Sequence, residues 1–421
     1  MNIGLIGSGG REHAICRKLC ESKITKKVFC FPGNAGTSKI AKNVEVDILD
    51  FKKILSLIKL YKIELVVIGP EEPLVKGLVN FLEKNKVKVF GPNKFASRLE
   101  GSKAFMKRLC KINKIPTAAF KICKKMSQVL YFIKNNNFPI VVKADGLAAG
   151  KGVTICKNKK QVIDISGEIF KGKFETSKKI VLEEFLDGEE ASYFLVVDKN
   201  NFKFFGSAQD HKRVKEKDKG PNTGGMGAYS PAPIINKKLE EKIINKIVNP
   251  TLKFLKKKRN PYRGFLYVGL MIKNNEPYLI EYNVRMGDPE CQVILPRLKT
   301  DLVKIIQNTI NNNLFKTKII WQNKKCMTIV LCSKGYPRAY KKNLIIKNLS
   351  KIKENKNTLV FHAGTRINNN ELVSIGGRVL NFVTLGHNFY NIRKKTIKML
   401  KKLNWKSGFY RKDIGWKVIG R

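Results

Sequence analysis

Short apolar runs alternate with amphipathic stretches through the first hundred residues of the chain. The runs predict strands and the stretches predict helices, because buried strands are continuously apolar whereas surface helices repeat about every 3.6 residues. Strands are expected at 1–7, 26–33, 64–70 and 87–92, and helices at 11–22, 51–61 and 75–84. This alternation predicts a doubly wound parallel sheet. Every strand ends in glycine or proline at its carboxyl edge, where such sheets bind ligands.

The pattern changes after a helical connector at 94–113. A compact unit at about 117–186 has strands at 138–144, 153–156 and 180–185, with a glycine-rich turn after the first. Later strands alternate less cleanly, which favours a mixed or antiparallel sheet. These strands lie at 192–197, 203–209, 264–272 and 277–283, with a loop at 211–233 and helices at 237–257 and 299–312. A new unit of short strands starts at 326 and ends in a helix near 388–403.

This organisation predicts a multidomain protein of α/β and α+β class. We expect an N-terminal α/β substrate-binding domain at 1–102 and a central domain at 103–322 that carries a mobile lid at about 117–186. A small C-terminal α+β domain would occupy 323–421. The length of 421 residues suits a division of this kind.

Composition excludes several classes of protein. Hydrophobic residues make up 43% of the chain, which is typical of globular proteins. No apolar run approaches the roughly 20 residues that span a bilayer, and the first residues lack the features of a signal peptide, so we expect a cytoplasmic protein. The nine cysteines form no CxxC pair, and we expect all nine to be buried and reduced.

The net charge of +50, from 83 basic and 33 acidic residues, raises the possibility of RNA binding. The lysines are spread as pairs over almost the whole chain, and asparagine and isoleucine are also abundant. All three residues have A/T-rich codons, so compositional drift is the simpler interpretation and we expect no specific nucleic-acid partner. The few acids, by contrast, cluster in glycine-rich or apolar segments, which indicates a function for them.

The segment IVVKADGLAAGKGV at 140–153 is the strongest local signal. A buried strand delivers Lys143, and Gly146, Gly150, Lys151 and Gly152 follow in a turn. Glycines allow backbone N–H groups to close over a polyphosphate, and lysines supply the opposite charge. The segment is not a Walker A motif, since it lacks GK[ST] and leads into a strand. The alternative is an ordinary hairpin with a glycine turn.

Two acidic segments could complete a nucleotide site. In VLEEFLDGEE, Phe185 and Leu186 could form the apolar wall for an adenine, and Glu190 could bind a ribose, although a solvated acidic turn is equally compatible. In YLIEYNVRMGDPE, strand alternation places Glu281, Asn283 and Arg285 on one face. Paired oxygen ligands suit Mg²⁺, and the arginine could neutralise a phosphoryl group. The alternative is a buried salt bridge.

Two further segments could bind substrates. Asp210, His211 and Lys212 open the long glycine-rich loop, and loops of that length are often functional, although this one could also be disordered. At the amino terminus, GSGGREH follows a strand and opens a helix, which predicts an anion site. It matches the dinucleotide motif only in part because position 12 is glutamate, so a phosphate monoester fits better than NAD.

Together these segments resemble the phosphoribosylamine–glycine ligases of the ATP-grasp superfamily. The resemblance covers essentially the whole chain in order: GSGGREHA, FPGNAGT, VIGPEEPLVKG, EGSKAF, VVKADGLAAGKGV, EEFLDGEEAS, QDHKRVKEKDKGPNTGGMGAYSP, GFLYVGLMI, IEYNVRMGDPE, FHAGT, GGRVL and RKDIGW. It implies an ATP-grasp fold for the central domain. It also implies a reaction in which ATP, glycine and 5-phosphoribosylamine give glycinamide ribonucleotide, ADP and phosphate through glycyl phosphate, in purine biosynthesis.

The resemblance implies roles for individual positions in nucleotide and metal binding. Lys103 and Lys143 would contact the ATP phosphates beneath the turn at 146–152. The adenine pocket and ribose contact would come from Glu183, Phe185, Leu186 and Glu190. Glu281 and Asn283 match ligands of Mg²⁺ or Mn²⁺, and Arg285 would stabilise the transferring phosphoryl group.

Its implications for the other substrates concern three regions of the chain. The phosphate and sugar of phosphoribosylamine would meet the N-terminal turns, at Gly9, Gly10, Gly33, Asn34, Gly36 and Thr37. Asp210, Lys212 and Asp288 would lie near the amine and glycine. The resemblance implies small-molecule partners only, and we expect a monomer. Another ATP-grasp carboxylate–amine ligase with a different acceptor is the nearest alternative.

Overall fold

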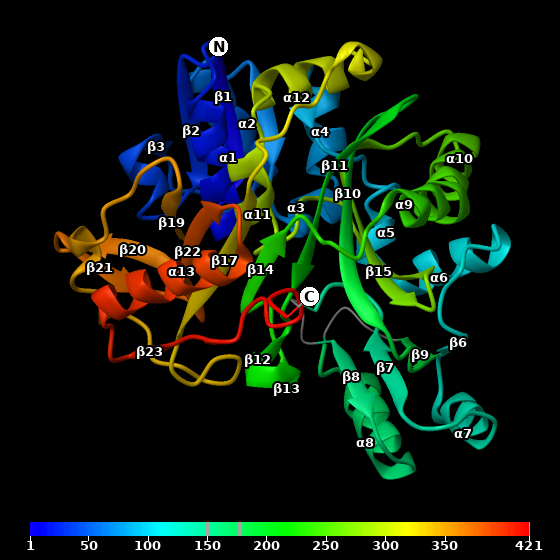
Figure 1. Ribbon diagram of the computed structural model, residues 1–421. Coiled ribbons are helices and arrows are strands. Elements are labelled where there is room, and N and C mark those ends of the chain that lie inside the picture. Colours follow the sequence, from blue (N-terminus) through cyan, green and yellow to red (C-terminus); the bar gives the residue numbers. More distant parts are fainter. Residues whose placement is uncertain (149–151, 175–178, 421) are drawn as a thin grey trace.

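The computed structural model describes residues 1–148, 152–174 and 179–420, and it has the mixed α/β and α+β multidomain fold predicted from the sequence. Gly150 and Lys151, predicted to cover a nucleotide, lie outside the described residues. Figure 1 shows the N-terminal sheet at the top and the unit containing β6 to β9 projecting at the lower right. The C-terminal part lies on the opposite side, at the left.

The N-terminal sheet is fully parallel, with strand order β3-β2-β1-β4-β5. Its strands are β1 (Asn2–Gly7), β2 (Lys27–Pro32), β3 (Lys42–Asn43), β4 (Leu65–Ile68) and β5 (Val89–Phe90). Its helices are α1 (Gly10–Cys20), α2 (Phe51–Leu60), α3 (Glu71–Lys76) and α4 (Leu78–Lys84). The single helix predicted at 75–84 is wrong, because Gly77, with φ of 99°, separates α3 from α4.

The connector between the first two domains is also divided. It contains α5 (Arg98–Gly101) and α6 (Lys103–Ile112) in place of one helix at 94–113. Ser102 separates the two because its backbone is extended, and its hydroxyl accepts a hydrogen bond from Phe105 N at the start of α6. This break places Glu100 and Lys103 at the edge of the central cavity.

A four-stranded sheet of order β6-β9-β7-β8 forms the unit that we name the lid unit. Its elements are β6 (Phe120–Cys123), α7 (Met126–Lys134), β7 (Ile140–Ala144), β8 (Val153–Cys156), α8 (Lys159–Phe170) and β9 (Ile180–Glu184). The two helices pack on the sheet around a small core of their own, which includes Val129, Val142 and Val162. The strands are antiparallel where β7 meets β8 and β9, so Lys143 faces Val181 in register.

A nine-stranded antiparallel sheet forms the body of the molecule, in the order β16-β15-β10-β11-β14-β17-β22-β19, with β23 paired to β17. The pairing of β14 with β17 carries this sheet across residue 323, where a separate domain was predicted to begin. Its strands are β10 (Glu189–Asp198), β11 (Phe202–Asp210), β14 (Gly227–Ser230), β15 (Arg263–Lys273), β16 (Glu276–Asn283), β17 (Lys325–Ser333), β19 (Thr358–His362), β22 (Arg378–Gly386) and β23 (Gly408–Phe409).

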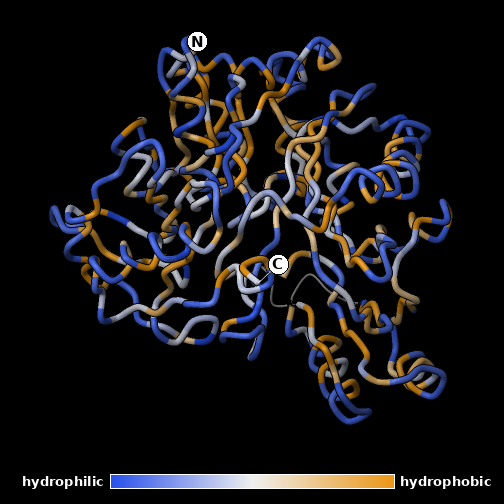
Figure 2. Tube along the Cα trace, viewed as in Figure 1, coloured by the Kyte–Doolittle hydropathy of each residue, from blue (hydrophilic) through white to orange (hydrophobic). Residues whose placement is uncertain are grey.

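The remaining elements flank this sheet. The helices are α9 (Lys237–Ile243), a π-turn at Ile244–Val248, α10 (Asn249–Lys257), α11 (Cys291–Ile294), α12 (Leu302–Ile310) and α13 (Phe389–Leu403). A small sheet pairs β18 (Leu344–Ile345), β21 (Glu371–Ser374) and β20 (Thr365–Asn368). Hydrophobic segments gather on the interior strands, whereas loops at the periphery are mostly hydrophilic (Figure 2). No described helix is long and apolar enough to cross a membrane.

Two further sequence predictions are wrong. The loop expected at 211–233 contains a hairpin of β12 (Arg213–Lys215) and β13 (Lys219–Asn222), followed by β14. Glycine content concealed these strands because all three are short, and because β14 pairs with the distant β17. Cys20 is exposed, whereas the other eight cysteines are buried as predicted, and all nine are free thiols.

Candidate active site

A cavity of about 610 Å³ lies between the lid unit, the large sheet and the connector. Most of the predicted site residues line it, although they come from segments far apart in the sequence. These are Lys103, Lys143, Gly146, Gly152, Glu183, Phe185, Leu186, Glu190, Asp210, Lys212, Glu281, Asn283, Arg285 and Asp288. Fourteen of the predicted site residues therefore face one space.

The inner end of the cavity holds a buried charge cluster. Lys143, on β7, lies 2.9 Å from the Glu183 carboxylate on β9, and Lys107, on α6, lies 3.0 Å from it. Lys107 Nζ also donates a hydrogen bond to Thr117 Oγ1 at 2.6 Å. Burial lowers the pKa of Lys107, although Glu183 opposes this effect. The Glu183 carboxylate, predicted at the adenine, is engaged by two lysines, of which Lys107 was not predicted.

The glycine-rich turn lies beside the connector. Lys103 Nζ donates to the carbonyl oxygen of Gly146 at 3.1 Å, and the Asp145 carboxylate accepts a hydrogen bond from Ser102 Oγ at 3.0 Å. Gly146 has φ of 98°, which favours glycine. Burial lowers the pKa of Lys103, with Glu281 raising it and Lys143 lowering it. This end of the cavity therefore presents two ammonium groups, from Lys103 and Lys143.

An apolar slot lies where β9 ends. Phe185 and Leu186 follow the last residue of β9 and line the cavity together with Val141, Ile155 and Leu279. Phe185 is 37% exposed, so part of its ring is open to a ligand in the cavity. Such a slot can accept a flat apolar ring such as adenine.

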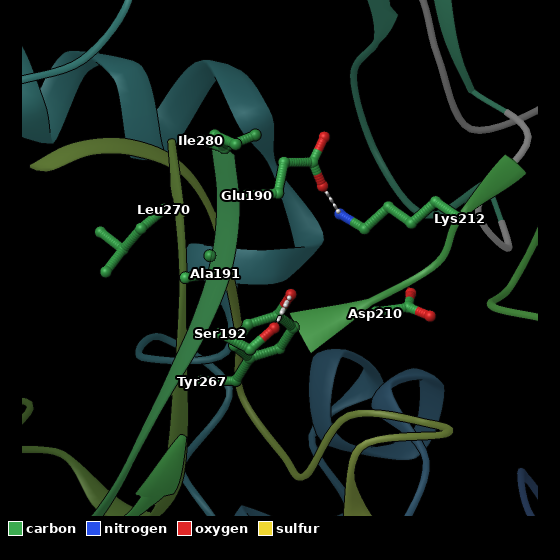
Figure 3. Close-up of a pocket in the computed structure, with 9 residues that line it drawn as sticks. Glu190, Ala191, Ser192, Asp210, Lys212, Tyr267, Leu270 and Ile280 are labelled. Atoms are coloured by element: carbon green, nitrogen blue, oxygen red, sulfur yellow. Dashed lines mark hydrogen bonds and ion pairs between the residues drawn. The ribbon is translucent and has the colours of Figure 1, made fainter. Parts of the chain in front are cut away.

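Lys212 joins the predicted ribose and metal residues. Its Nζ lies 3.2 Å from Glu190 Oε2 and 3.4 Å from Glu281 Oε1. Figure 3 shows the Lys212 and Glu190 side chains pointing toward each other, with Asp210 near the base of Lys212. Burial would raise the pKa of Glu281, but Lys212, Lys143 and Lys103 hold it at about 2. Glu281 is therefore an ionised carboxylate at neutral pH.

The donor set at Glu281 and Asn283 fits a magnesium-type cation. Both residues lie on β16 two positions apart, so their side chains share one face of the strand. Within the described residues, no group of three or more His, Cys, Asp or Glu side chains is placed to hold a metal. Mg²⁺ usually takes only one or two protein carboxylates and obtains its other ligands from phosphates and water. One carboxylate and one amide oxygen therefore suffice.

Arg285 lies just beyond the end of β16 and not on the strand itself. Its Nε is 3.1 Å from Glu71 Oε2 and its Nη2 is 2.8 Å from Glu100 Oε1. Burial would raise the pKa of Glu71, but Arg285 and Arg11 lower it to about 2. Burial raises the pKa of Glu100 to about 7, although Arg285 opposes the shift. Arg285 is thus held by carboxylates from two segments that precede the lid unit.

Asp288 joins three parts of the chain. Its carboxylate lies 3.3 Å from Arg378 Nη1 on β22, and it accepts hydrogen bonds from Gln292 Nε2 at 2.8 Å and from Arg11 N at 3.3 Å. Burial would raise the pKa of Asp288, but Arg378 and Arg11 lower it below its ordinary value. Asp288 is therefore ionised, and its carboxylate is contacted by Arg378, Gln292 and Arg11.

Asp210 has the opposite electrostatic setting. Burial raises its pKa well above the ordinary value, and the nearby Glu290 adds to this effect. Its Oδ1 has no hydrogen-bond partner among the described residues. Glu290 is 3% exposed and accepts a hydrogen bond from Ser192 Oγ at 3.2 Å. The pair gives the cavity two carboxylates that retain protons more strongly than exposed ones.

The six predicted N-terminal substrate residues, Gly9, Gly10, Gly33, Asn34, Gly36 and Thr37, do not line this cavity. Gly9 N donates to Glu12 Oε2 at 2.7 Å, so that amide at the start of α1 is already engaged. The Asn34 amide nitrogen donates to Ser8 O and His362 O, and its Oδ1 accepts from the amides of Gly36 and Thr37. Asn34 therefore holds the turn at 33–37 against the C-terminal part of the chain.

Comparisons with known proteins decide the family. Models of phosphoribosylglycinamide synthetase match three successive parts of the chain: the N domain at 1–100, the ATP-grasp (A) domain at 101–291 and the C domain at 326–417. The phosphoribosylamine–glycine ligase of Agrobacterium fabrum is 44% identical over 422 residues, which cover 100% of this chain and 99% of that protein. The chain belongs to the phosphoribosylamine–glycine ligase family.

Other members and more distant structures agree with this assignment. The phosphoribosylamine–glycine ligase of Caldanaerobacter subterraneus is 42% identical and covers 98% of this chain and 99% of that protein. The crystal structure of the phosphoribosylamine–glycine ligase of Thermotoga maritima has a TM-score of 0.86 at 34% identity, covering 98% of this chain and 100% of that one. A biotin carboxylase from Campylobacter jejuni shares only the fold, with a TM-score of 0.75 at 15% identity, covering 100% of this chain and 95% of that one.

In this member of the phosphoribosylamine–glycine ligase family, several cavity residues escaped prediction as site residues. They are Arg11, Glu71, Glu100 and Arg378, all of which line the cavity. Most stand within motifs that carried the resemblance, such as GSGGREHA, VIGPEEPLVKG, EGSKAF and GGRVL. A charged residue inside an apolar or glycine-rich motif was the available signal, because an unpaired buried charge is costly.

Proposed function

We propose that this protein ligates glycine to 5-phosphoribosylamine with ATP, giving glycinamide ribonucleotide, ADP and phosphate, the second step of purine biosynthesis. One observation supports this function above all others. The ionised Glu281 faces the cations Lys103, Lys143 and Lys212 across one cavity, as a triphosphate with its metal requires. The family membership identifies the acceptor and the acid, which the cavity alone does not specify.

ATP would lie along the cavity between the lid unit and β16. Adenine would occupy the slot at Phe185 and Leu186, near Glu183, while Glu190 would bind the ribose hydroxyls. Lys103 and Lys143 would contact the phosphates, and the turn at 146–152, including Gly150 and Lys151, would cover them. Each lysine is placed in advance by a partner, since Gly146 O holds Lys103 and Glu183 holds Lys143. Such preorganisation reduces the entropy lost when the nucleotide binds.

Glu281 and Asn283 would hold Mg²⁺ or Mn²⁺. When bound, the cation neutralises charge on the ATP phosphates and so favours attack on them. Lys212 now lies 3.4 Å from Glu281, so its ammonium group occupies part of the space beside that carboxylate. The Lys212 side chain would shift toward Glu190 when the nucleotide and cation enter, because its ammonium group already forms an ion pair with the Glu190 carboxylate.

The chemical steps begin with a glycine carboxylate oxygen, which attacks the γ-phosphorus as the bond to ADP breaks and glycyl phosphate forms. Arg285 would stabilise the charge on the transferring group. The amine nitrogen of phosphoribosylamine then attacks the carbonyl carbon, and phosphate leaves. The amine must lose a proton, and the raised pKa of Asp210 suits its carboxylate to accept it. Asp288, which stays ionised, would order Arg11 and Arg378 around the acceptor.

The phosphoribosyl group would meet the N-terminal turns that adjoin Asp288. A Cβ atom added at Gly9 would lie 3.2 Å from Asp288 Oδ2, so this turn is adjacent to the cavity that Asp288 lines. Gly9, Gly10 and the turn of Gly33, Gly36 and Thr37 would receive the phosphate and sugar, with Asn34 holding the turn in shape. Lys212 would lie near the glycine end.

We also propose that the enzyme acts as a cytoplasmic monomer with small-molecule partners only. A uniformly basic surface predicts RNA affinity that falls steeply with salt, without sequence preference. Sedimentation would report the state of assembly.

The function is tested by ADP release with a panel of carboxylic acids and amines. We expect turnover only when glycine and phosphoribosylamine are both present, with glycinamide ribonucleotide as the product by mass spectrometry. Turnover that ignores glycine, or that prefers another acid or amine, would indicate a different ATP-grasp ligase. Tight, salt-resistant and sequence-dependent RNA binding without ligation would instead indicate an RNA-binding protein.

A further inference from the structure

Arg285 is clamped by two carboxylates that both lie outside its own sheet. Glu71 is the first residue of α3 in the N-terminal domain, and Glu100 belongs to α5 in the connector. The Arg285 side chain is 15% exposed, with Nε at 3.1 Å from Glu71 Oε2 and Nη2 at 2.8 Å from Glu100 Oε1. Its Nη1 donates to the carbonyl oxygen of Met286 at 3.1 Å. All three nitrogens therefore have a partner.

We infer that Glu71 and Glu100 are positioning residues that fix the guanidinium plane of Arg285 for phosphoryl transfer. The inference rests on the proposed function, because it takes Arg285 as the group that meets the transferring phosphoryl. Neither glutamate needs to touch a substrate for this role.

Arginine needs such a clamp here for a geometric reason. A guanidinium has five N–H donors in a rigid fork, and its long stem has several rotatable bonds. Glu71, Glu100 and Met286 engage one donor each, so two N–H groups on Nη1 and Nη2 remain for substrate oxygens. Because the fork is planar, contacts on Nε and Nη2 determine the direction in which the remaining donors point. An unclamped Arg285 would sample several directions.

The charge balance leads to the same conclusion. Arg11, with its side chain 7% exposed, approaches Glu71 at 3.9 Å and is a second cation beside Arg285. Two nearly buried arginines repel each other and lose hydration, so they need nearby negative charge to remain in place. Glu71 lies between them and serves both. Loss of its charge would therefore move Arg285 away from Arg11 and toward the open cavity.

A purely structural role for Glu100 is the main alternative. Its Oε2 accepts a hydrogen bond from Val284 N at 2.7 Å, which could fix the end of β16 regardless of Arg285. Glutamine at position 100 keeps an oxygen acceptor for Val284 N but replaces the oxygen that faces Arg285 Nη2 with an amide NH2 group, which cannot accept a hydrogen bond. The substitution Glu100→Gln therefore separates the two roles.

The experiment compares Glu71→Gln and Glu100→Gln with Glu72→Gln, a matched control at an exposed neighbouring position. We expect kcat for glycine-dependent ADP release to fall about 10- to 100-fold in the first two variants, as for a catalytic group misplaced by about 1 Å. KM for ATP should remain near wild type, and kcat is measured well below the melting temperature of each variant, which falls because each substitution removes a partner of Arg285. The control should match wild type throughout.

A double-variant cycle supplies a readout that a structural role would not change. In an Arg285→Ala background, Glu71→Gln and Glu100→Gln should lower kcat less than twofold further, because their effect acts through the missing guanidinium. The inference would be overturned if each glutamate substitution lowered kcat by the same factor in the Arg285→Ala background as in wild type. It would also be overturned if Glu71→Gln and Glu100→Gln had the same kcat as Glu72→Gln. If Glu100→Gln does not fold, Glu71→Gln alone decides. A wild-type protein without glycine-dependent ADP release would instead overturn the proposed function.

Discussion

The buried cluster of Lys107, Glu183 and Lys143 provides a quantitative test of how the nucleotide end of the cavity is stabilised. The Lys107 side chain is completely buried and Glu183 is 4% exposed. The carboxylate lies 3.0 Å from Lys107 Nζ and 2.9 Å from Lys143 Nζ. Because two lysines share one carboxylate, removal of the acid and removal of one base should have unequal effects.

The magnitudes follow from the distances. At an effective dielectric constant of about 20, each pair attracts with roughly 5 kcal/mol before desolvation. Glu183→Gln removes the carboxylate in direct contact with two buried ammonium groups, so we expect the free energy of unfolding to fall by about 3–5 kcal/mol. Lys107→Met leaves the Lys143–Glu183 pair intact and removes the hydrogen bond to Thr117, so a loss of about 1–2 kcal/mol is expected.

Hydrogen–deuterium exchange of β7 and β9 is the appropriate assay, because a multidomain chain need not unfold in one step. Amides of these strands should exchange fastest in Glu183→Gln, and Lys107→Met should lie close to wild type. The double variant Lys107→Met/Glu183→Gln should exchange more slowly than Glu183→Gln, since it removes one of the two unpaired ammonium groups. Equal damage from both single variants, or a double variant worse than either, would refute the charge-sharing argument.

Three other predictions address the metal site, pH dependence and the domain contact. Glu281→Ala should abolish nucleotide-dependent Mn²⁺ binding by electron paramagnetic resonance and lower ligation by at least roughly 100-fold, whereas Glu276→Ala, on the same strand, should do neither. Burial lowers the pKa of His211 and His362 to about 3 and that of His13 well below its ordinary value. Unfolded histidines bind protons below about pH 6.5, whereas these buried ones stay neutral. The free energy of unfolding is therefore unaffected by them above pH 6.5 and declines below it by up to about 1.4 kcal/mol per pH unit for each histidine. Glu100, whose pKa is raised to about 7, acts in the opposite direction over this range, so the test compares two proteins. The urea midpoint should decrease more from pH 6.5 to pH 5.5 in wild type than in His362→Phe, and equal decreases would contradict this. Asn34→Ala should lower the free energy of unfolding by roughly 3 kcal/mol, because it removes the hydrogen bonds of a buried amide, including the one to His362 O. Amide exchange should become faster both in the turn at 33–37 and around His362. Faster exchange in the turn alone would show that the contact with His362 is unimportant.

Much of the fold was predictable because local patterns determine local structure. The apolar runs of β1, β4 and β7 and the glycine turns after them required no knowledge of distant partners. Local breaks were predicted less well. Gly77 and Ser102 each divide a helix that amphipathic periodicity joined, because a single backbone angle outweighs a favourable side-chain pattern.

The site shows the same division. Strand alternation correctly placed Glu281 and Asn283 on one face, since the side-chain period of a strand is a local property. It did not place Arg285, because β16 ends at Asn283 and the contacts of Arg285 then decide its position. Glu183 was expected at an adenine, yet its carboxylate pairs with Lys107 and Lys143.

The sequence by itself determined the longer strands, the glycine turns that follow several of them, and which residues carry charge in apolar surroundings. Only the tertiary structure decided how those charges pair: Arg285 with Glu71, 214 positions away, and Arg378 with the main chain of Asp288, 90 positions away. The physical reason is that periodicity acts over a few residues, whereas a charge removed from water is stabilised by whichever opposite charge the chain topology brings within hydrogen-bonding distance.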